Sequence, residues 1–197
     1  MGRIYYGWYV VGVAMVTYML LIGISVSAFG AFVVPVSRDL HLSRADANSG
    51  LILMNLGAAC LAPLVGRALD RLPLKLVLMA AVTCFAAALV GLGLSKSLLL
   101  SAGLLLLPLA VGVSGAGTLG MTVLMARWFE AQRGRAIALG MVGMSLGGVI
   151  APLVAGGLIE RVGWRATLVI LGCATATILL LLILGPATAA IVWSFFA

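Results

Sequence analysis

The sequence predicts an all-α membrane protein that crosses the bilayer six times, and three observations lead to this prediction. Hydrophobic residues make up 64% of the chain and charged residues 9%, against about 45–50% and about 25% in an ordinary soluble domain. Six long stretches contain no charged side chain: 4–37, 47–66, 76–95, 97–126, 136–159 and 166–197. The 12 basic and 5 acidic side chains all lie outside these stretches, as expected when a charge at the bilayer centre costs about 2.5–3.5 kcal/mol.

Each stretch reaches the length of about 20 residues that a helix needs to cross about 30 Å of hydrocarbon. Pro35 ends the first span, residues 95–97 form a tight connection between the third and fourth spans, and a Gly-Pro pair closes the sixth. We therefore expect one six-helix transmembrane domain over residues 1–186. The apolar tail, residues 187–197, is too short for a seventh span. It is expected either at the membrane interface or as the stub of a longer chain.

The net charge of +7 comes from basic residues scattered over five connectors rather than gathered on one face, which argues against nucleic acid as a partner. With six spans both termini lie on one side, and the positive-inside rule favours the cytoplasm. The cytoplasmic set is then Arg3, Arg67, Arg71, Lys75, Arg127, Arg133 and Arg135. The outer set is Arg38, Arg44, Lys96, Arg161 and Arg165. We expect insertion into the lipid bilayer of the cytoplasmic (inner) membrane, with the first helix as its own insertion signal.

No enzymatic or metal chemistry is expected. Residues 112–115, GVSG, match the nucleophile pattern of rhomboid-type intramembrane proteases, but the only histidine, His41, lies in the first connector. Residues 115–120, GAGTLG, match a dinucleotide fingerprint, but in the middle of a span their amides are already bonded within the helix. The three cysteines lie inside apolar stretches without C-x-x-C spacing and indicate neither disulfides nor a metal or cofactor site: Cys60, Cys84 and Cys173.

Two connectors, residues 66–75 and 156–165, share one pattern at an offset of 90 residues, G-x-x-x-[D/E]-R-x-[P/G]-x-[K/R]. The matched pairs are Gly66 with Gly156, Asp70 with Glu160, Arg71 with Arg161, and Lys75 with Arg165. The same offset superimposes the flanking spans, which predicts two three-helix repeats over about 4–95 and 97–186. Because three is odd, the second repeat is inverted in the membrane, as in many secondary transporters. The alternative is that the two connectors are alike without a repeat, because any connector of this kind needs a glycine where the chain leaves the helix and basic residues on either side.

The first connector resembles the signature loop between helices 2 and 3 of the major facilitator superfamily, through Gly66, Asp70, Arg71 and Lys75. Pro73 stands where that family usually has glycine. The helix 4–5 loop, with Arg127, Arg133 and Arg135, resembles that of monocarboxylate and oxalate/formate-type members, and residues 7–15 and 163–172 fit the same group. The resemblance covers residue 7 to about residue 186 and implies one six-helix half of a twelve-helix fold. It also implies that the signature loop latches against the other half; topological anchoring alone is the alternative.

Small residues predict where helices approach closely. Gly112, Ala116 and Gly120 form a small-xxx-small stripe on the fourth span, and Gly143 with Gly147 forms G-x-x-x-G on the fifth. Gly66 is expected to let helices approach, and Asp70 to lie near the first turn of the third helix, where a negative charge meets the positive end of the helix dipole.

Candidate substrate contacts are neutral, because no span contains an ionisable carboxylate, amine or guanidinium. Ser114, Thr118 and Thr122 recur at i, i+4 and i+8 on the fourth span, a continuous stripe. The remaining candidates are Tyr18 and Ser25 on the first span, Asn55 on the second and Ser145 on the fifth. For serine and threonine the alternative is a hydrogen bond to their own i−4 carbonyl. Asn55 and Tyr18 are favoured because an amide or phenol facing lipid is costly.

The leading hypothesis is a secondary transporter that moves a small organic solute, such as a mono- or dicarboxylate, by alternating access. The alternative is a truncated or half-size six-helix module that must pair with a second half and does not transport alone. A second six-helix half is an expected partner under either hypothesis, as the same chain continued, a companion chain or a second copy.

Overall fold

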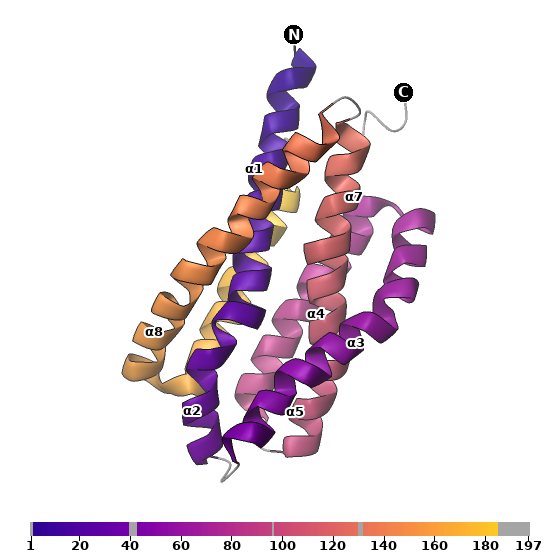
Figure 1. Ribbon diagram of the computed structural model, residues 1–197. Helices are drawn as coiled ribbons and strands as arrows, with labels where there is room; N and C mark the ends of the chain where they lie inside the picture. The colour runs from indigo at the N-terminus through magenta and orange to yellow at the C-terminus, as the bar shows by residue number, and fades with distance from the viewer. Residues whose placement is uncertain (1, 40–42, 96, 130–131, 185–197) are drawn as a thin grey trace.

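The computed structural model describes residues 2–39, 43–95, 97–129 and 132–184, and within these ranges every element is helical. Figure 1 shows a bundle of long helices that run side by side between two ends. The elements are α1 (Gly2–Ile22), η1 (Gly23–Ser27), α2 (Phe29–Asp39), α3 (Arg44–Arg71), α4 (Leu74–Leu94), α5 (Leu98–Leu104), η2 (Leu105–Leu109), α6 (Ala110–Gly112), η3 (Val113–Thr118), α7 (Leu119–Trp128) and α8 (Arg133–Leu184).

Several of these elements join end to end into five long apolar helices that can span a membrane. They are Gly7–Asp39, Asn48–Arg71, Leu74–Leu94, Leu98–Trp128 and Arg133–Leu184. Each exceeds the length of about 20 residues needed to cross the hydrocarbon core. This confirms the predicted all-helical membrane architecture. Within the described residues these long helices number five where six spans were expected, because Arg133–Leu184, of 52 residues, covers the fifth and sixth predicted spans with only a kink at Gly163 between them.

Gly163 bends α8 within that connector. Its φ of 80° and ψ of 162° are not helical, and the positive φ is a conformation that glycine adopts without a Cβ penalty. A straight helix of this length would extend about 1.5 Å per residue, more than twice the thickness of the hydrocarbon core. Figure 1 shows the first arm (residues 133–162, orange) descending beside α1 and the second arm (residues 164–184, yellow) turning back.

The two arms pack on different helices through glycines. A Cβ on Gly143 would collide with the carbonyl oxygen of Met15 in α1, and one on Gly147 would lie 3.0 Å from the Cα of Met19. On the second arm, a Cβ on Gly172 would lie 3.1 Å from the carbonyl oxygen of Ala86 in α4. The predicted G-x-x-x-G contact on the fifth span is therefore confirmed, and its partner is α1.

The small-residue stripe of the fourth span is also confirmed as a packing face. A Cβ on Gly112 would lie 2.5 Å from the Cβ of Phe85, and one on Gly120 would lie 2.7 Å from Leu78. Ala116, between them, is fully buried. No described part of this chain approaches Gly66, because nothing lies within 4 Å of a Cβ placed there. Its repeat-equivalent, Gly156, faces open space in the same way.

Three π-helical segments, η1, η2 and η3, interrupt the first and fourth long helices. In η1 the amide of Ala28 donates to the carbonyl of Gly23, five residues back, at 2.8 Å. In η2, Pro108 has no amide hydrogen to continue the α-helical pattern. Such segments change which side of the helix the following residues occupy, and they occur frequently at functional sites.

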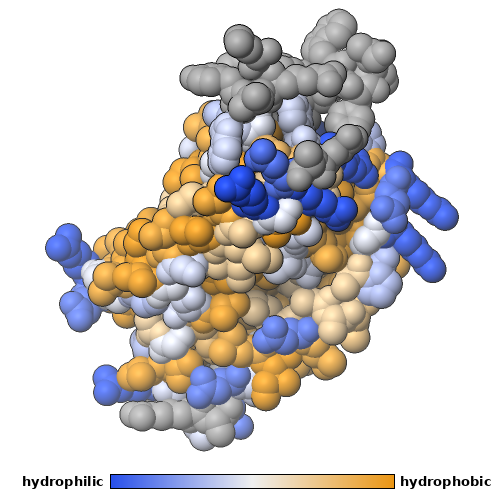
Figure 2. All heavy atoms as spheres, turned by 45° about the horizontal axis from the view of Figure 1, so that its top comes forward, coloured by the Kyte–Doolittle hydropathy of each residue, from blue (hydrophilic) through white to orange (hydrophobic). Residues whose placement is uncertain are grey.

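The buried core and the outer surface are both apolar. Tyr18, Phe85 and Leu21 are among the largest fully buried side chains, while Leu99 and Leu153 are 84% and 73% exposed. Figure 2 shows a broad hydrophobic belt, with hydrophilic groups gathered toward the two ends of the bundle. An exposed leucine carries no penalty in contact with lipid, so this belt is the surface of a membrane protein.

Candidate functional site

A hydrogen-bonded pair joins the first and fourth long helices. Tyr18 of α1 is 1% exposed, and its hydroxyl lies 3.1 Å from Oγ1 of Thr122 in α7. Thr122 donates its own hydroxyl hydrogen to the carbonyl of Thr118 at 2.6 Å. Since that hydrogen is used, Tyr18 is the donor and Thr122 the acceptor of the contact between the two helices. The structure thus brings together the hydroxyls of Tyr18 and Thr122, two of the seven candidates, and Thr118 takes part through its backbone carbonyl.

The predicted continuous stripe on the fourth span is not continuous. Ser114 is 4% exposed and buried, whereas Thr118, four residues later, is exposed. Both lie in η3, where hydrogen bonds between residues five apart replace the α-helical pattern. The spacing of 3.6 residues per turn assumed for the stripe therefore does not hold there.

The other three candidates do not join this group. Ser25 is buried in η1 and donates to the carbonyl of Leu21 at 2.5 Å. Asn55 is exposed on α3, and its Nδ2 donates to the carbonyl of Leu51 at 2.8 Å. Ser145 is exposed on the first arm of α8. The alternative of bonding to the i−4 carbonyl is confirmed for Ser25 and Thr122, and Asn55 satisfies its amide in the same way.

The signature segment is more helical than expected. Residues from Gly66 through Arg71 belong to α3, and only Leu72 and Pro73 connect it to α4. Asp70 therefore lies in the last turn of α3, and α4 has no acidic residue in its first turn. The expected pairing of Asp70 with the positive end of the third helix was wrong, because α3 extends past it. Asp70 instead meets the negative end of the α3 dipole, which the neighbouring Arg71 offsets.

Arg127 connects the helix 4–5 loop to the signature segment. It lies in the last turn of α7, and its Nη2 donates to the carbonyl of Leu69 at 3.0 Å. A cation on one of the last carbonyls of a helix satisfies an unpaired acceptor and the negative end of the dipole. Arg133 and Arg135 are exposed in the first turn of α8. We call this end of the bundle the Arg127 end.

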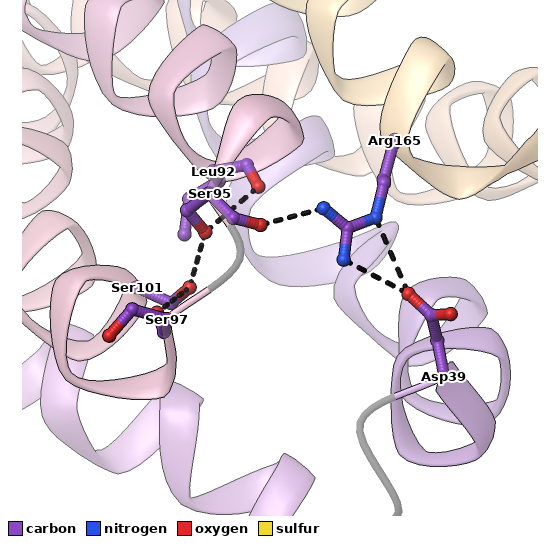
Figure 3. Close-up of polar contacts among 6 residues, drawn as sticks. All are labelled: Asp39, Leu92, Ser95, Ser97, Ser101 and Arg165. Carbon is purple, nitrogen blue, oxygen red and sulfur yellow. Dashed lines mark hydrogen bonds and ion pairs between the residues drawn. The ribbon is translucent and has the colours of Figure 1, made fainter.

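The opposite end is tied together by Arg165 (Figure 3), in the second arm of α8. Its Nη2 and Nε lie 3.0 and 3.3 Å from Oδ2 of Asp39 at the end of α2. Its Nη1 donates to the carbonyl of Ser95, just after α4, at 2.7 Å. The guanidinium also lies 4.6 Å from the ring centroid of Trp164. We call this end the Arg165 end.

Sequence reasoning selected Arg165 as the equivalent of Lys75 and did not select Asp39. The two side chains are separated by 126 positions, and no spacing rule connects them. Glu160 and Arg161, the other charged residues of the repeat-equivalent connector, are exposed.

No group of three or more histidine, cysteine, aspartate or glutamate side chains in the described ranges is arranged to hold a metal ion. Cys60, Cys84 and Cys173 are free cysteines.

Long apolar helices, an apolar outer belt and charged residues at both ends together define an integral, multi-pass membrane protein. A match to the model of the Major Facilitator Superfamily extends over residues 7–192, and the chain belongs to that superfamily. It is therefore a transport protein of the secondary-transporter type. A search of curated proteins found no match.

Proposed function

We propose that the chain forms a six-helix transporter unit of the monocarboxylate or oxalate/formate type, in the cytoplasmic membrane with both termini in the cytoplasm. It moves a small organic solute, such as a mono- or dicarboxylate, by alternating access. The observation that carries this proposal is the hydrogen bond from buried Tyr18 to Thr122, beside the exposed Thr118. The hydroxyls of Tyr18 and Thr122 are polar groups inside an apolar bundle, and the exposed Thr118 beside them offers a solute a hydrogen-bond partner.

The offset of 90 residues supports an inverted repeat of two three-helix units. Shifted by 90, η1 falls on residues 113–117, and η3 covers Val113–Thr118. The break at Pro73 between α3 and α4 falls on Gly163, the bend of α8. With this layout the two arms of α8 are the fifth and sixth spans, and the number of spans agrees with the six predicted from the sequence.

Two glycines at the same offset support this layout independently. A Cβ on Gly57 of α3 would lie 2.9 Å from the carbonyl carbon of Leu106 in η2. Gly147, 90 residues later, packs on Met19 of α1. The second helix thus packs on the fourth, and the fifth packs on the first. A two-fold axis that exchanges the first helix with the fourth and the second with the fifth turns one of these contacts into the other, as an inverted repeat requires.

The neutral character of the site favours pairing with a second six-helix half. A carboxylate solute needs a cation or several hydrogen-bond donors, and the basic side chains of this chain all lie outside its six uncharged stretches. Gly66 and Gly156 face open space, and Asn55 and Ser145 are exposed. A partner half that supplies the cation and covers these positions completes the site. The alternative function is a half-size module that is inactive without this partner.

Uptake into liposomes tests the proposal. The purified chain is reconstituted and supplied with radiolabelled mono- and dicarboxylates, alone and together with a candidate second half. We expect the Tyr18→Phe and Thr122→Val variants to lower uptake about tenfold, as loss of hydrogen bonds at the solute would do. Thr83→Val is the matched control, because Thr83 makes the same i−4 bond on the exposed side of α4. No uptake from a folded, monomeric sample would refute transport by this half alone, and uptake only with the second half would establish the alternative.

The signature segment is proposed to act as a latch against the second half. We expect Asp70→Asn to change transport or assembly while leaving membrane insertion at the wild-type level, because Asp70 is exposed at the end of α3 and makes no hydrogen bond or ion pair with its side chain among the described residues. Insertion is measured by protease protection, and assembly by co-purification. Glu160→Gln, at the Arg165 end, removes the same charge as a control. An equal loss of insertion and transport in Asp70→Asn would refute the latch.

A further inference from the structure

A cavity of about 150 Å³ lies at the Arg165 end of the bundle. It is partly open, and its lining comes from η1, α2, α3, α4, α5, η2 and the second arm of α8. Its deep wall includes Ile24, Leu89 and Leu109, all buried, and its exposed wall includes Asp46 and Leu98. Tyr18, Thr118 and Thr122 do not line it. The cavity is therefore separate from Tyr18, Thr118 and Thr122, the residues that carry the proposed solute site, although Ser25, another candidate substrate contact, lines it.

The three hydroxyl groups that line this cavity have already used their hydrogens. Ser25 donates to the carbonyl of Leu21, and Ser49 to the carbonyl of Asp46 at 2.6 Å. Ser101 lies within hydrogen-bond distance of the Ser97 carbonyl, at 3.0 Å, and of the Ser95 hydroxyl, at 2.6 Å. Each oxygen still has acceptor capacity, so toward a ligand these hydroxyls act as acceptors.

Among the described residues, one carboxylate lines the cavity and adds a further acceptor. Asp46 caps α3 through its Oδ2, which accepts from the amide of Ser43 at 3.3 Å and from its hydroxyl at 2.7 Å. An ionised carboxylate has about four lone-pair sites, so capacity remains for a ligand. The indole of Trp164 completes the polar part of the lining. Acceptors thus outnumber donors on the wall, and a second carboxylate would meet them with repulsion.

The size and lining of the cavity define the chemistry of a ligand. An apolar cavity of about 150 Å³ is large enough for benzene, and most of this lining is aliphatic or aromatic. We propose that the cavity binds a small amphipathic molecule with an apolar body about the size of a benzene ring and a head group that donates hydrogen bonds, an ammonium or a hydroxyl. The apolar body fills the deep wall, and the head group lies toward Asp46 and Ser49.

Three probes that share one ring test the head-group preference: benzylamine, benzyl alcohol and benzoate. Binding to the full chain in detergent is measured by saturation-transfer NMR and calorimetry. We expect benzylamine and benzyl alcohol to bind, and benzoate to bind at least about tenfold more weakly, a difference of about 1.4 kcal/mol. Benzoate binding as tightly as benzylamine would overturn the proposal.

Filling the cavity tests the location. Ala102 lines the cavity on α5, and Ala102→Leu is expected to weaken benzylamine binding about tenfold by occupying the space. Ala80→Leu, on the exposed side of α4, is the matched control and is expected to bind as the wild type does. Equal binding by wild type and Ala102→Leu would mean partition into detergent and would overturn the proposal.

Asp46→Asn keeps the cavity open and retains a side-chain oxygen for the cap, so it does not depend on how Ala102→Leu folds. This variant is expected to weaken the binding of benzylamine severalfold and to leave the binding of benzyl alcohol unchanged, because only the ammonium responds to the carboxylate charge. Benzylamine binding that is unchanged in Asp46→Asn would refute the assigned head-group position. A phospholipid that co-purifies in the cavity and is not displaced by the probes would refute the small-molecule ligand.

Discussion

The Gly143→Ala variant is expected to unfold at a markedly lower temperature than the wild type. A Cβ at this position would collide with the carbonyl oxygen of Met15 and lie 2.8 and 2.9 Å from the carbonyl carbon and Cα of the same residue. These are backbone atoms, so no side-chain rotation relieves the overlap, and α1 and α8 must move apart. Overpacking of this kind costs about 1–3 kcal/mol. The lost contact between two long helices adds to that cost, because close packing is what holds helices together in lipid.

Heating the detergent-solubilised chain and measuring the monodisperse fraction by size-exclusion chromatography gives the midpoint. Gly156→Ala is the matched control, in the same arm of α8, where nothing lies within 4 Å of an added Cβ. Alanine there gains helix propensity of up to about 1 kcal/mol, so its midpoint is expected to equal or exceed that of the wild type. If both variants lost the same stability, the close contact between α1 and α8 would be refuted.

The Arg165→Met variant is expected to lose about 2 kcal/mol of stability and to loosen the Arg165 end. The side chains of Arg165 and Asp39 are 34% and 47% exposed, so their ion pair contributes about 1 kcal/mol or less. The larger part comes from the charged hydrogen bond to the Ser95 carbonyl at 2.7 Å, a kind of bond that contributes about 1.5–3 kcal/mol. Arg165→Lys is expected to recover only part of this, because a single ammonium cannot reproduce the planar fork that contacts both partners.

The same thermal measurement distinguishes the two contributions when Arg165→Met is combined with Asp39→Asn in a double-mutant cycle. The coupling energy is expected to be about 0.2–1 kcal/mol, and smaller in high salt. Arg161→Met, at an exposed arginine four residues earlier, is the control and is expected to have almost no effect. Full stability in Arg165→Lys, or an equal loss in Arg161→Met, would contradict this role for Arg165.

Several features of the fold were predictable because they depend on composition and local spacing. The apolar stretches predicted the long helices, since the cost of charge in hydrocarbon applies wherever a stretch lies in the fold. Gly143 and Gly147 predicted a packing face, because two small residues four apart leave one side of a helix open to a neighbour. The identity of that neighbour, α1, needed the structure.

Helix ends and local helix geometry were the main sources of error. Asp70 was expected near the first turn of the third helix, but α3 continues to Arg71 and the break before α4 is only two residues long. The stripe of Ser114, Thr118 and Thr122 assumed α-helical spacing. The π-helical segment η3 interrupts that spacing at the place where Gly112 and Gly115 pack against α4. Neither effect follows from the propensities of the residues themselves.

The sequence by itself determined that the chain lies in a lipid bilayer. It also determined the local features of the fold: hydrophobic stretches, charged connectors, glycine packing faces and the 90-residue offset between two similar connectors. Only the tertiary structure decided which distant groups meet. The contact of Tyr18 with Thr122 spans 104 positions, and that of Arg165 with Asp39 spans 126. The physical reason is that burial in lipid depends on each stretch alone, whereas a hydrogen bond within about 3 Å depends on how helices far apart in the chain pack together.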